Sequence, residues 1–302
     1  MNVFVAGASG TIGIPLVRAL VAAGHRVTAM TRSPEKQASL AALGASPALA
    51  DALDSAALTR VVAAAKPDVV IHQLTNLPKT GVRSVKDLES TNRLRVDGTH
   101  NLIDAAVAAH ARRIVGASFA MVLAAKPDRD GRLEPGAAAM KSMESQIVQA
   151  NRDRRIEGIV LRYGMWYGPA NPMTQQMVAM AKRRMLPVVR GDRSLLPVLH
   201  LEDAVSAAVA ALDRGVPGAI YDIVDDEPVS MTEVVRELAA RTGAPAPFAV
   251  PSWIPRLLSP YMARVTSVRL PLSNAKARAE LGWRPAYPTM RDGLARTMSA
   301  AA

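Results

Sequence analysis

The sequence predicts an α/β protein with a doubly wound parallel sheet and a smaller C-terminal lobe. Two observations predict this class: short β-branched runs alternate with alanine-rich helical stretches up to about residue 162, and prolines then interrupt the rhythm. Of the 302 residues, 49% are hydrophobic and 21% are charged, so the chain has enough apolar side chains to bury a large core. We therefore expect a globular protein and no intrinsic disorder.

Five apolar runs are predicted as strands of the sheet: residues 3–5, 27–30, 68–74, 113–117 and 159–162. The part from Val69 to Ile71 is continuously apolar, which is typical of a strand buried on both faces. The helices between the strands have recognisable ends. The first ends at Gly24, and the second begins at Ser33-Pro34 and ends at Gly44.

The second part of the chain predicts fewer regular elements. Residues 198–213 predict one more helix, with Asp203 as a cap, and residues 219–224 predict one more strand. The residues from Ser230 to Glu233 form a capping box that opens a helix ending at Gly243. Residues 253–262 predict a helix with a wide apolar stripe, either a packing surface or a lid over an apolar substrate.

A glycine-rich turn follows the first strand and opens the first helix, and it carries the strongest functional signal. It comprises Gly7, Ser9, Gly10, Thr11, Ile12 and Gly13. In such a turn the first glycine allows a tight bend, the second lets the backbone approach a pyrophosphate, and the third lets the helix pack closely on the sheet. The free N–H groups at the helix start attract an anion. The turn therefore predicts a Rossmann-type dinucleotide site.

Several further stretches accompany this turn. They are Ala50 to Asp54, Pro67 to His72, Asp97 to Leu102, Leu161 to Pro169, Val198 to Asp203 and Ser273 to Trp283. Together with the Gly-x-x-Gly-x-x-Gly spacing, the chain resembles the extended short-chain dehydrogenase/reductases, the NAD-dependent epimerase/dehydratase family, over essentially its whole length. The resemblance implies that residues 1–167, rejoined by about 198–224, bind the dinucleotide. Residues 168–197 and 225–302 would form the substrate-binding lobe.

The resemblance also implies further residues of the cofactor site: Asp51 and Ala52 beside the adenine, and Leu74, Lys141 and Gly164. The choice of cofactor follows from charge. NAD enzymes often carry an acid after the second strand, whereas this chain has Arg32 there. A guanidinium suits the 2′-phosphate of NADP, so we expect NADP rather than NAD.

The sequence departs from the catalytic motif of this family. Its members use a Tyr-x-x-x-Lys pair as general acid/base, together with a Ser or Thr that polarises the substrate oxygen. Lys141 fits the lysine, but Ala137 stands where the tyrosine would be, and aligning Glu144 with the family's glutamate puts Gly136 there instead. Ser118 is the hydroxyl that follows the predicted strand over residues 113–117.

Another acid would then have to transfer the proton. Tyr163 and Tyr167 are the nearest candidates, because their segment borders the nicotinamide in the relatives. The expected catalytic set is therefore Ser118, Lys141, Tyr163 and Tyr167. The leading hypothesis is an NADP-dependent oxidoreductase that transfers hydride to or from a small, partly apolar carbonyl or enone compound. The alternatives are an NADP-binding regulatory or scaffold protein without dehydrogenase activity, and a non-redox isomerase or dehydratase on the same fold.

The amino-acid composition excludes several kinds of site and partner. The chain has no cysteine, which excludes disulfides and thiolate catalysis, and its five histidines show no metal-ligand spacing, so we expect no metal. The net charge of +11 suits anionic cofactors, but with 4% aromatic residues we expect no nucleic-acid partner. We expect a cytoplasmic protein with a small-molecule substrate and no membrane contact, and a homodimer stays open.

Overall fold

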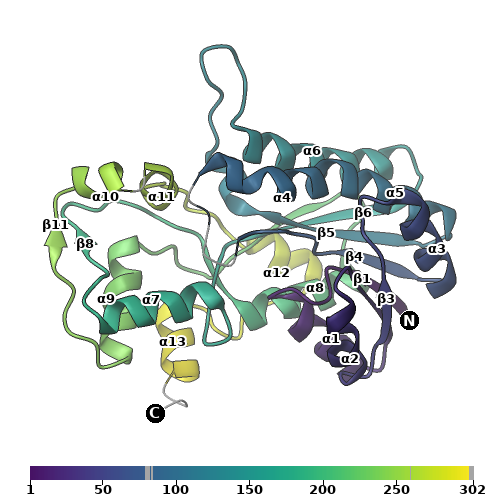
Figure 1. Cartoon of the computed structure of the whole chain (residues 1–302), viewed down its shortest axis with the longest axis horizontal. Helices are drawn as coiled ribbons and strands as arrows, with labels where there is room; N and C mark the ends of the chain where they lie inside the picture. Colours follow the sequence, from purple (N-terminus) through teal and green to yellow (C-terminus); the bar gives the residue numbers. More distant parts are fainter. Residues whose placement is uncertain (79–81, 83, 259, 299–302) are drawn as a thin grey trace.

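A seven-stranded parallel sheet forms the centre of the computed structural model, which describes residues 1–78, 82, 84–258 and 260–298 (Figure 1). The strand order is β10-β6-β5-β4-β1-β2-β3, and all six pairings are parallel. The strands are β1 (Asn2–Ala6), β2 (Arg26–Thr31), β3 (Ser46–Leu49), β4 (Val69–His72), β5 (Arg113–Phe119), β6 (Glu157–Tyr163) and β10 (Ile220–Ile223). The winding direction reverses between β1 and β4, so the predicted doubly wound fold is confirmed.

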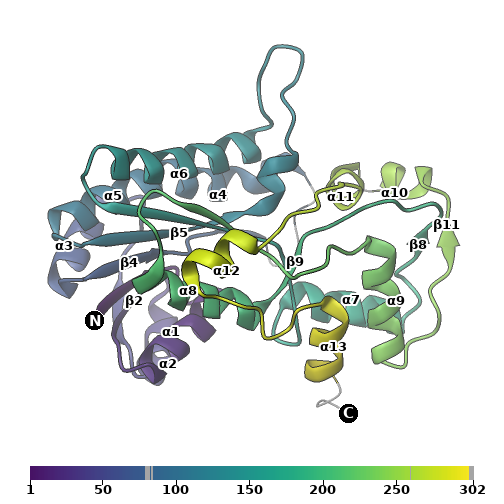
Figure 2. The ribbon, with the colours of Figure 1, turned by 180° about the vertical axis from the view of Figure 1, so that it is seen from behind.

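Helices cover both faces of the sheet, and each face has its own apolar core (Figures 1 and 2). One core joins the strands to α1 (Gly13–Ala22), α8 (Leu201–Arg214) and α12 (Ala275–Leu281). The other joins them to α3 (Ser55–Ala65), α5 (Thr99–Ala108) and α6 (Pro135–Arg152). Two short helices, α2 (Gln37–Ala41) and α4 (Glu89–Arg93), complete these layers.

The smaller lobe lies beside the carboxyl ends of the strands (Figure 1). It carries two pairs of short parallel strands, β7 (Met165–Tyr167) with β9 (Val198–His200) and β8 (Val188–Val189) with β11 (Ala249–Val250). Its helices are α7 (Pro172–Lys182), α9 (Met231–Arg241), α10 (Trp253–Leu258), α11 (Pro260–Thr266) and α13 (Met290–Met298). The division of the chain into two domains stays a prediction.

The structure corrects three expectations for local elements. Residues Val198–His200 form a strand, so the helix predicted there begins only at Leu201. Asp203 does not cap this helix. Its carboxylate instead accepts the N–H groups of Ala286 and Tyr287, because the C-terminal segment packs against α8 at that point. The stripe predicted over 253–262 is divided between α10 and α11, with residue 259 outside the described part.

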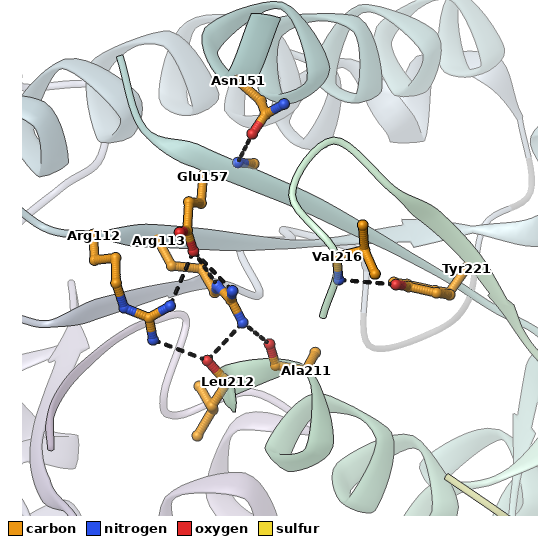
Figure 3. A network of polar contacts seen from close by, with 9 residues as sticks. Arg112, Arg113, Asn151, Glu157, Ala211, Leu212, Val216 and Tyr221 are labelled. Atoms are coloured by element: carbon orange, nitrogen blue, oxygen red, sulfur yellow. Dashed lines mark hydrogen bonds and ion pairs between the residues drawn. The ribbon is translucent and has the colours of Figure 1, made fainter. Parts of the chain in front are cut away.

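Arg113, at the start of β5, ties the amino edge of the sheet to the end of α8 (Figure 3). Its guanidinium donates to the carbonyl oxygens of Ala211 and Leu212 at 2.8 and 2.7 Å, and to the carboxylate of Glu157 at 2.9 Å. These carbonyls belong to the last turn of α8, where the helix dipole favours a cation. The network therefore holds α8 at the edge of the sheet opposite to the strand ends that could bind a ligand.

Across the described part of the chain, no helix combines the length and the apolar character needed to cross a bilayer.

Candidate functional site

The predicted cofactor residues follow strand ends along one edge of the sheet. Because the main strands are parallel, their carboxyl ends share an edge. In strand order, Asp51 and Ala52 follow β3, Arg32 follows β2, the glycine turn follows β1, Leu74 follows β4, and Gly164 follows β6. Ligands of open α/β sheets bind outside this edge, where the winding direction reverses. The glycine turn stands at that point, because β1 lies between β2 and β4.

The three glycines of the turn meet different surroundings. Gly7 has a φ of +89°, and a Cβ on it would lie 2.5 Å from the carbonyl oxygen of Gln73. A Cβ on Gly13 would lie 2.3 Å from the carbonyl oxygen of Gly7. A Cβ on Gly10 would meet only that oxygen within 4 Å, at 3.3 Å. The fold itself therefore requires Gly7 and Gly13, whereas a side chain at Gly10 would meet a single backbone oxygen.

The start of α1 has no capping side chain. Ile12, its N-cap residue, makes no side-chain hydrogen bond to the helix, and the first turn contains no acidic residue. The free N–H groups and the partial positive charge of the helix are therefore available to an anion. Thr11 is exposed beside them, and the hydroxyl of Ser9 lies 3.0 Å from that of Thr31. The charge of this helix start therefore suits a dinucleotide pyrophosphate.

Arg32 extends from the end of β2 into solvent. Its Nη2 atom donates to Oδ1 of Asn76 at 2.7 Å. No aspartate or glutamate of the described residues forms an ion pair with Arg32. The guanidinium therefore keeps its positive charge and several free donors beside the glycine turn.

The other predicted cofactor residues have structural partners of their own. Asp51 accepts the N–H of Leu53 at 2.9 Å, and the carbonyl of buried Ala52 accepts an amide hydrogen from Asn101. A Cβ on Gly164 would lie 2.9 Å from the carbonyl oxygen of Pro197, so this glycine lets the chain pass close to β9.

His72, at the end of β4, fixes the backbone at Leu74. Nδ1 of His72 accepts the N–H of Leu74 at 3.2 Å, and Nε2 lies 2.8 Å from the hydroxyl of Thr99. Burial, helped by the charge of Arg95, lowers the pKa of His72 to about 4. The imidazole is therefore neutral near pH 7 and serves as a fixed hydrogen-bonding group.

Ser118 belongs to a buried polar network on the α6 face of the sheet. Its hydroxyl donates to Oε1 of Glu144 at 2.6 Å. Arg162, the β6 residue paired with Ser118, donates to both oxygens of the same carboxylate at 2.8 and 2.7 Å. These hydrogen bonds to Glu144 raise the pKa of Arg162. The serine hydroxyl is therefore engaged within the protein.

The contact between Glu144 and Ser118 fixes which residues of α6 face the sheet. Gly136, Met140 and Glu144 lie at intervals of four and are all buried. Lys141 is one position away from this buried stripe and is exposed, where it lines a surface groove with Arg152. Gly136 is also closely packed, since a Cβ on it would lie 2.8 Å from a methyl carbon of Leu88.

Tyr163 lies on the opposite face of the sheet from Ser118. It packs in the core that contains α1 and α8, is 1% exposed, and has its ring 5.7 Å from that of Trp166. Its hydroxyl accepts an amide hydrogen of Gln73 at 3.5 Å. Burial raises the pKa of this phenol, which weakens it as an acid at neutral pH.

Tyr167 points into the core of the smaller lobe. Its hydroxyl donates to Oδ2 of Asp225 at 2.8 Å and lies 3.2 Å from the carbonyl oxygen of Thr289. Burial raises the pKa of Asp225 to about 8, and burial together with the charge of Asp225 raises the pKa of Tyr167. His200 packs edge-on against Tyr167, and burial lowers the pKa of His200 to about 4.

The predicted catalytic side chains are therefore not gathered into one group. Ser118 faces α6, Tyr163 faces the opposite core, Tyr167 points into the smaller lobe, and Lys141 is exposed on α6. Their catalytic roles stay predictions, and these positions weigh against them. Sequence reasoning missed Asn76, which no local pattern marks. It also noticed Glu144 and Arg162 only as parts of motifs, although their spacing on α6 and β6 could have indicated a pair.

Comparison with known proteins gives consistent results. The model of the NAD-dependent epimerase/dehydratase family matches residues 3–224. Over 310 residues the chain is 38% identical to a 3-diazoavenalumate denitrifying reductase of a Streptomyces species, covering 98% of this chain and 100% of the relative. It is 30% identical over 264 residues to a 2-alkyl-3-oxoalkanoate reductase of Stenotrophomonas maltophilia, covering 81% and 77% of the two chains.

Solved structures share the fold at lower identity. The UDP-glucose 4-epimerase of Thermus thermophilus, in complex with NAD, has a TM-score of 0.78 and 22% identity, covering 99% of this chain and 98% of its own. A dTDP-glucose 4,6-dehydratase of Streptomyces venezuelae, with NAD bound, has a TM-score of 0.79 and 23% identity, covering 99% and 96%. The glycine turn, the strand order and the family match lead to one conclusion: the chain belongs to the NAD-dependent epimerase/dehydratase family.

Proposed function

We propose that the chain is an NADP-dependent reductase that delivers hydride to a small, partly apolar acceptor. The observation that carries the proposal is the charge of Arg32 beside the glycine turn. No described carboxylate pairs with it, and an NAD enzyme would often place an acid at this position. Relatives named as reductases support the oxidoreductase part of the proposal.

Residues at the carboxyl ends of the strands would each bind a different part of the cofactor. Gly10 and the free N–H groups at the start of α1 would hold the pyrophosphate, and Arg32 would hold the 2′-phosphate. Asp51 and Ala52 would lie beside the adenine, while Leu74 and Gly164 would line the way toward the nicotinamide. When bound, NADPH supplies a hydride; the chain's own part is to orient the acceptor and to provide or withhold a proton.

The acceptor class follows first from the relatives. A 2-alkyl-3-oxoalkanoate reductase and a quinoline-oxide ketoreductase of Stigmatella aurantiaca, the latter 28% identical over 309 residues, both have names that describe carbonyl reduction. A partly apolar ketone or enone is therefore our first substrate class. Hydride addition to a ketone creates an alkoxide, which needs a proton or an equivalent electrostatic partner.

A second class needs no such proton, and the geometry favours it. The hydroxyl of Tyr163 is buried in the core, and that of Tyr167 donates to Asp225. Gly136, Ala137 and Met140 supply no side-chain donor from the buried side of α6. An aryl diazonium ion can accept a hydride and release dinitrogen, so that Ar–N₂⁺ and H⁻ give Ar–H and N₂ with no alkoxide formed. The name of the Streptomyces relative describes a reductase of this kind.

A deuterium-transfer screen tests the proposal. Purified protein is incubated with NADPH deuterated at C4 and with three acceptor sets: apolar ketones, enones and ortho-hydroxyaryl diazonium compounds. We expect one set to give a product with one deuterium, accompanied by loss of the 340 nm absorbance of NADPH. Tight NADPH binding with no deuterated product from any set would favour the regulatory or scaffold alternative, and deuterium-free turnover would favour an isomerase or dehydratase.

The tyrosines are tested with the acceptor that this screen identifies. Loss of a general acid lowers turnover by about 10²-fold or more. Because Tyr163 is buried in the core and the hydroxyl of Tyr167 donates to Asp225, we expect Tyr163→Phe and Tyr167→Phe each to keep turnover within about threefold of the parent. A loss of about 10²-fold in either variant, with NADPH affinity unchanged, would restore that tyrosine as the proton donor.

A further inference from the structure

The hydrogen bond between Arg32 and Asn76 crosses the opening above the glycine turn. Arg32 follows β2, Asn76 follows β4 by four residues, and β1, which carries the turn, lies between these two strands. We propose that Asn76 positions Arg32 for the 2′-phosphate and so helps to select NADP. This inference rests on the proposed function.

Asn76 is itself held in place, which is what a positioning residue requires. Its N–H donates to the hydroxyl of Thr91 at 2.6 Å, and its side-chain amide donates to the hydroxyl of Ser90. Both partners belong to α4, and Thr91 is fully buried. Asn76 therefore presents Oδ1 from a fixed place, while Arg32 alone would be a long exposed side chain with many rotamers to lose on binding.

The chemical character of Asn76 matters as much as its position. A carboxylate at this point would pair with the guanidinium and neutralise the charge that attracts a phosphate. A neutral amide oxygen accepts one of the five N–H donors of the arginine and leaves the positive charge in place. Since none of the described carboxylates pairs with Arg32, the amide orients the cation without competing for it.

Two variants separate position from charge. Asn76→Ala removes the acceptor, and Asn76→Asp keeps an acceptor but adds a negative charge. The probes are 2′,5′-ADP and 5′-AMP, which differ only in the 2′-phosphate, and the readout is the dissociation constant from isothermal titration. Asn92→Asp, on the neighbouring helix α4, is the control for net charge, and melting temperatures show that each variant is folded.

We expect Asn76→Ala to weaken 2′,5′-ADP binding by about threefold to tenfold, the scale of one hydrogen bond. Asn76→Asp should weaken it by about tenfold or more, because the new carboxylate opposes the phosphate. Binding of 5′-AMP should stay within about twofold in both variants, as should 2′,5′-ADP binding in Asn92→Asp. In an Arg32→Ala background, Asn76→Ala should not change 2′,5′-ADP affinity further, because residues in contact are non-additive. Asn76→Asp should still weaken binding in that background, because its carboxylate opposes the phosphate without Arg32 as well.

The outcomes separate this inference from the proposed function. One outcome is that the parent prefers 2′,5′-ADP and that both Asn76 variants bind 2′,5′-ADP with the dissociation constant of the parent. Asn76 then has no positioning role, although the NADP assignment stands. An equal effect of Asn76→Ala with and without Arg32 would also overturn the inference, since Asn76 would then act independently. If the parent does not distinguish the two probes, the NADP assignment itself fails, and the inference with it.

Discussion

The two ends of the ligand-facing edge use their polar side chains in opposite ways. Above β1 and β2, Arg32 is exposed with its charge uncompensated, and the start of α1 has no capping side chain. Above β5 and β6, Ser118 donates to Glu144, and Arg162 closes on the same carboxylate with two hydrogen bonds. The end above β1 and β2 therefore leaves hydrogen-bond donors free for an anion. At the end above β5 and β6, Ser118, Glu144 and Arg162 bond to one another.

The proposed function therefore places cofactor binding and proton transfer in different parts of this chain. A dinucleotide site needs free N–H groups, a cation and little side-chain volume, and all three are present at the first end. A proton-transfer site needs a titratable group that faces the acceptor, and the tyrosines nearest to the second end face other parts of the protein. The second end is therefore expected to respond to mutation mainly through stability.

The largest expected effect is the loss of Glu144. Replacing it with alanine removes the hydrogen-bonded carboxylate of partly buried Arg162, which keeps only the longer ion pair to Asp222 at 3.9 Å among the described residues, and leaves Ser118 without its acceptor. Removing one partner of a buried ion pair costs about 3–5 kcal/mol, so Glu144→Ala should lower the free energy of unfolding by that amount in urea titrations. Exposed Glu227, replaced in the same way, should change it by less than about 0.5 kcal/mol. A stable Glu144→Ala variant that lost only turnover would show that this network serves catalysis.

Asp225 should make the smaller lobe sensitive to pH. Its pKa is raised to about 8 by burial, so the folded protein holds a proton that the unfolded chain releases from about pH 4 upward. The folded state then binds more protons between about pH 4 and 8, and the free energy of unfolding falls as the pH rises through this window. The fall should be on the order of a few kcal/mol. Unfolding curves of Asp225→Asn should be flatter across this range, and identical pH profiles for the two proteins would contradict the assignment.

Gly10 tests the cofactor end without disturbing the fold. Because a Cβ on Gly10 would meet only the carbonyl oxygen of Gly7, at 3.3 Å, Gly10→Val should disturb the fold little and should place its methyl groups where the pyrophosphate approaches. We expect NADPH affinity to fall by about 100-fold, while the melting temperature stays close to that of the parent. Gly13→Val, whose Cβ would meet a backbone oxygen at 2.3 Å, should instead destabilise the protein. Unchanged NADPH affinity in Gly10→Val would place the cofactor elsewhere.

Sequence alone could predict the features that are local in the chain. The strand, the glycine turn and the helix are consecutive, and the capping box at Ser230 forms as expected because its partners are three residues apart. β3 escaped the residue pattern because it is short and contains Pro47, and only the family resemblance implied a strand there.

Contacts between distant segments could not be predicted in this way. Asp203 was expected to cap a helix, yet it binds the backbone of Ala286 and Tyr287, more than eighty residues away. The hydrogen bonds from Tyr167 to Asp225 and from Arg32 to Asn76 likewise join residues that are far apart in the sequence. The direction of a side chain decides whether it catalyses or packs, and this direction depends on the assembled fold.

The most direct test of the account is the affinity of the protein for NADPH and NADH, measured by fluorescence titration of the parent and of Arg32→Ala. A charge-assisted contact contributes about 1.5–3 kcal/mol, so the parent should bind NADPH at least about tenfold more tightly than NADH. Arg32→Ala should bind the two cofactors within about threefold of each other, with NADH affinity unchanged. Equal affinities in the parent, or a preference for NADH, would contradict the proposal that this chain is an NADP-dependent reductase.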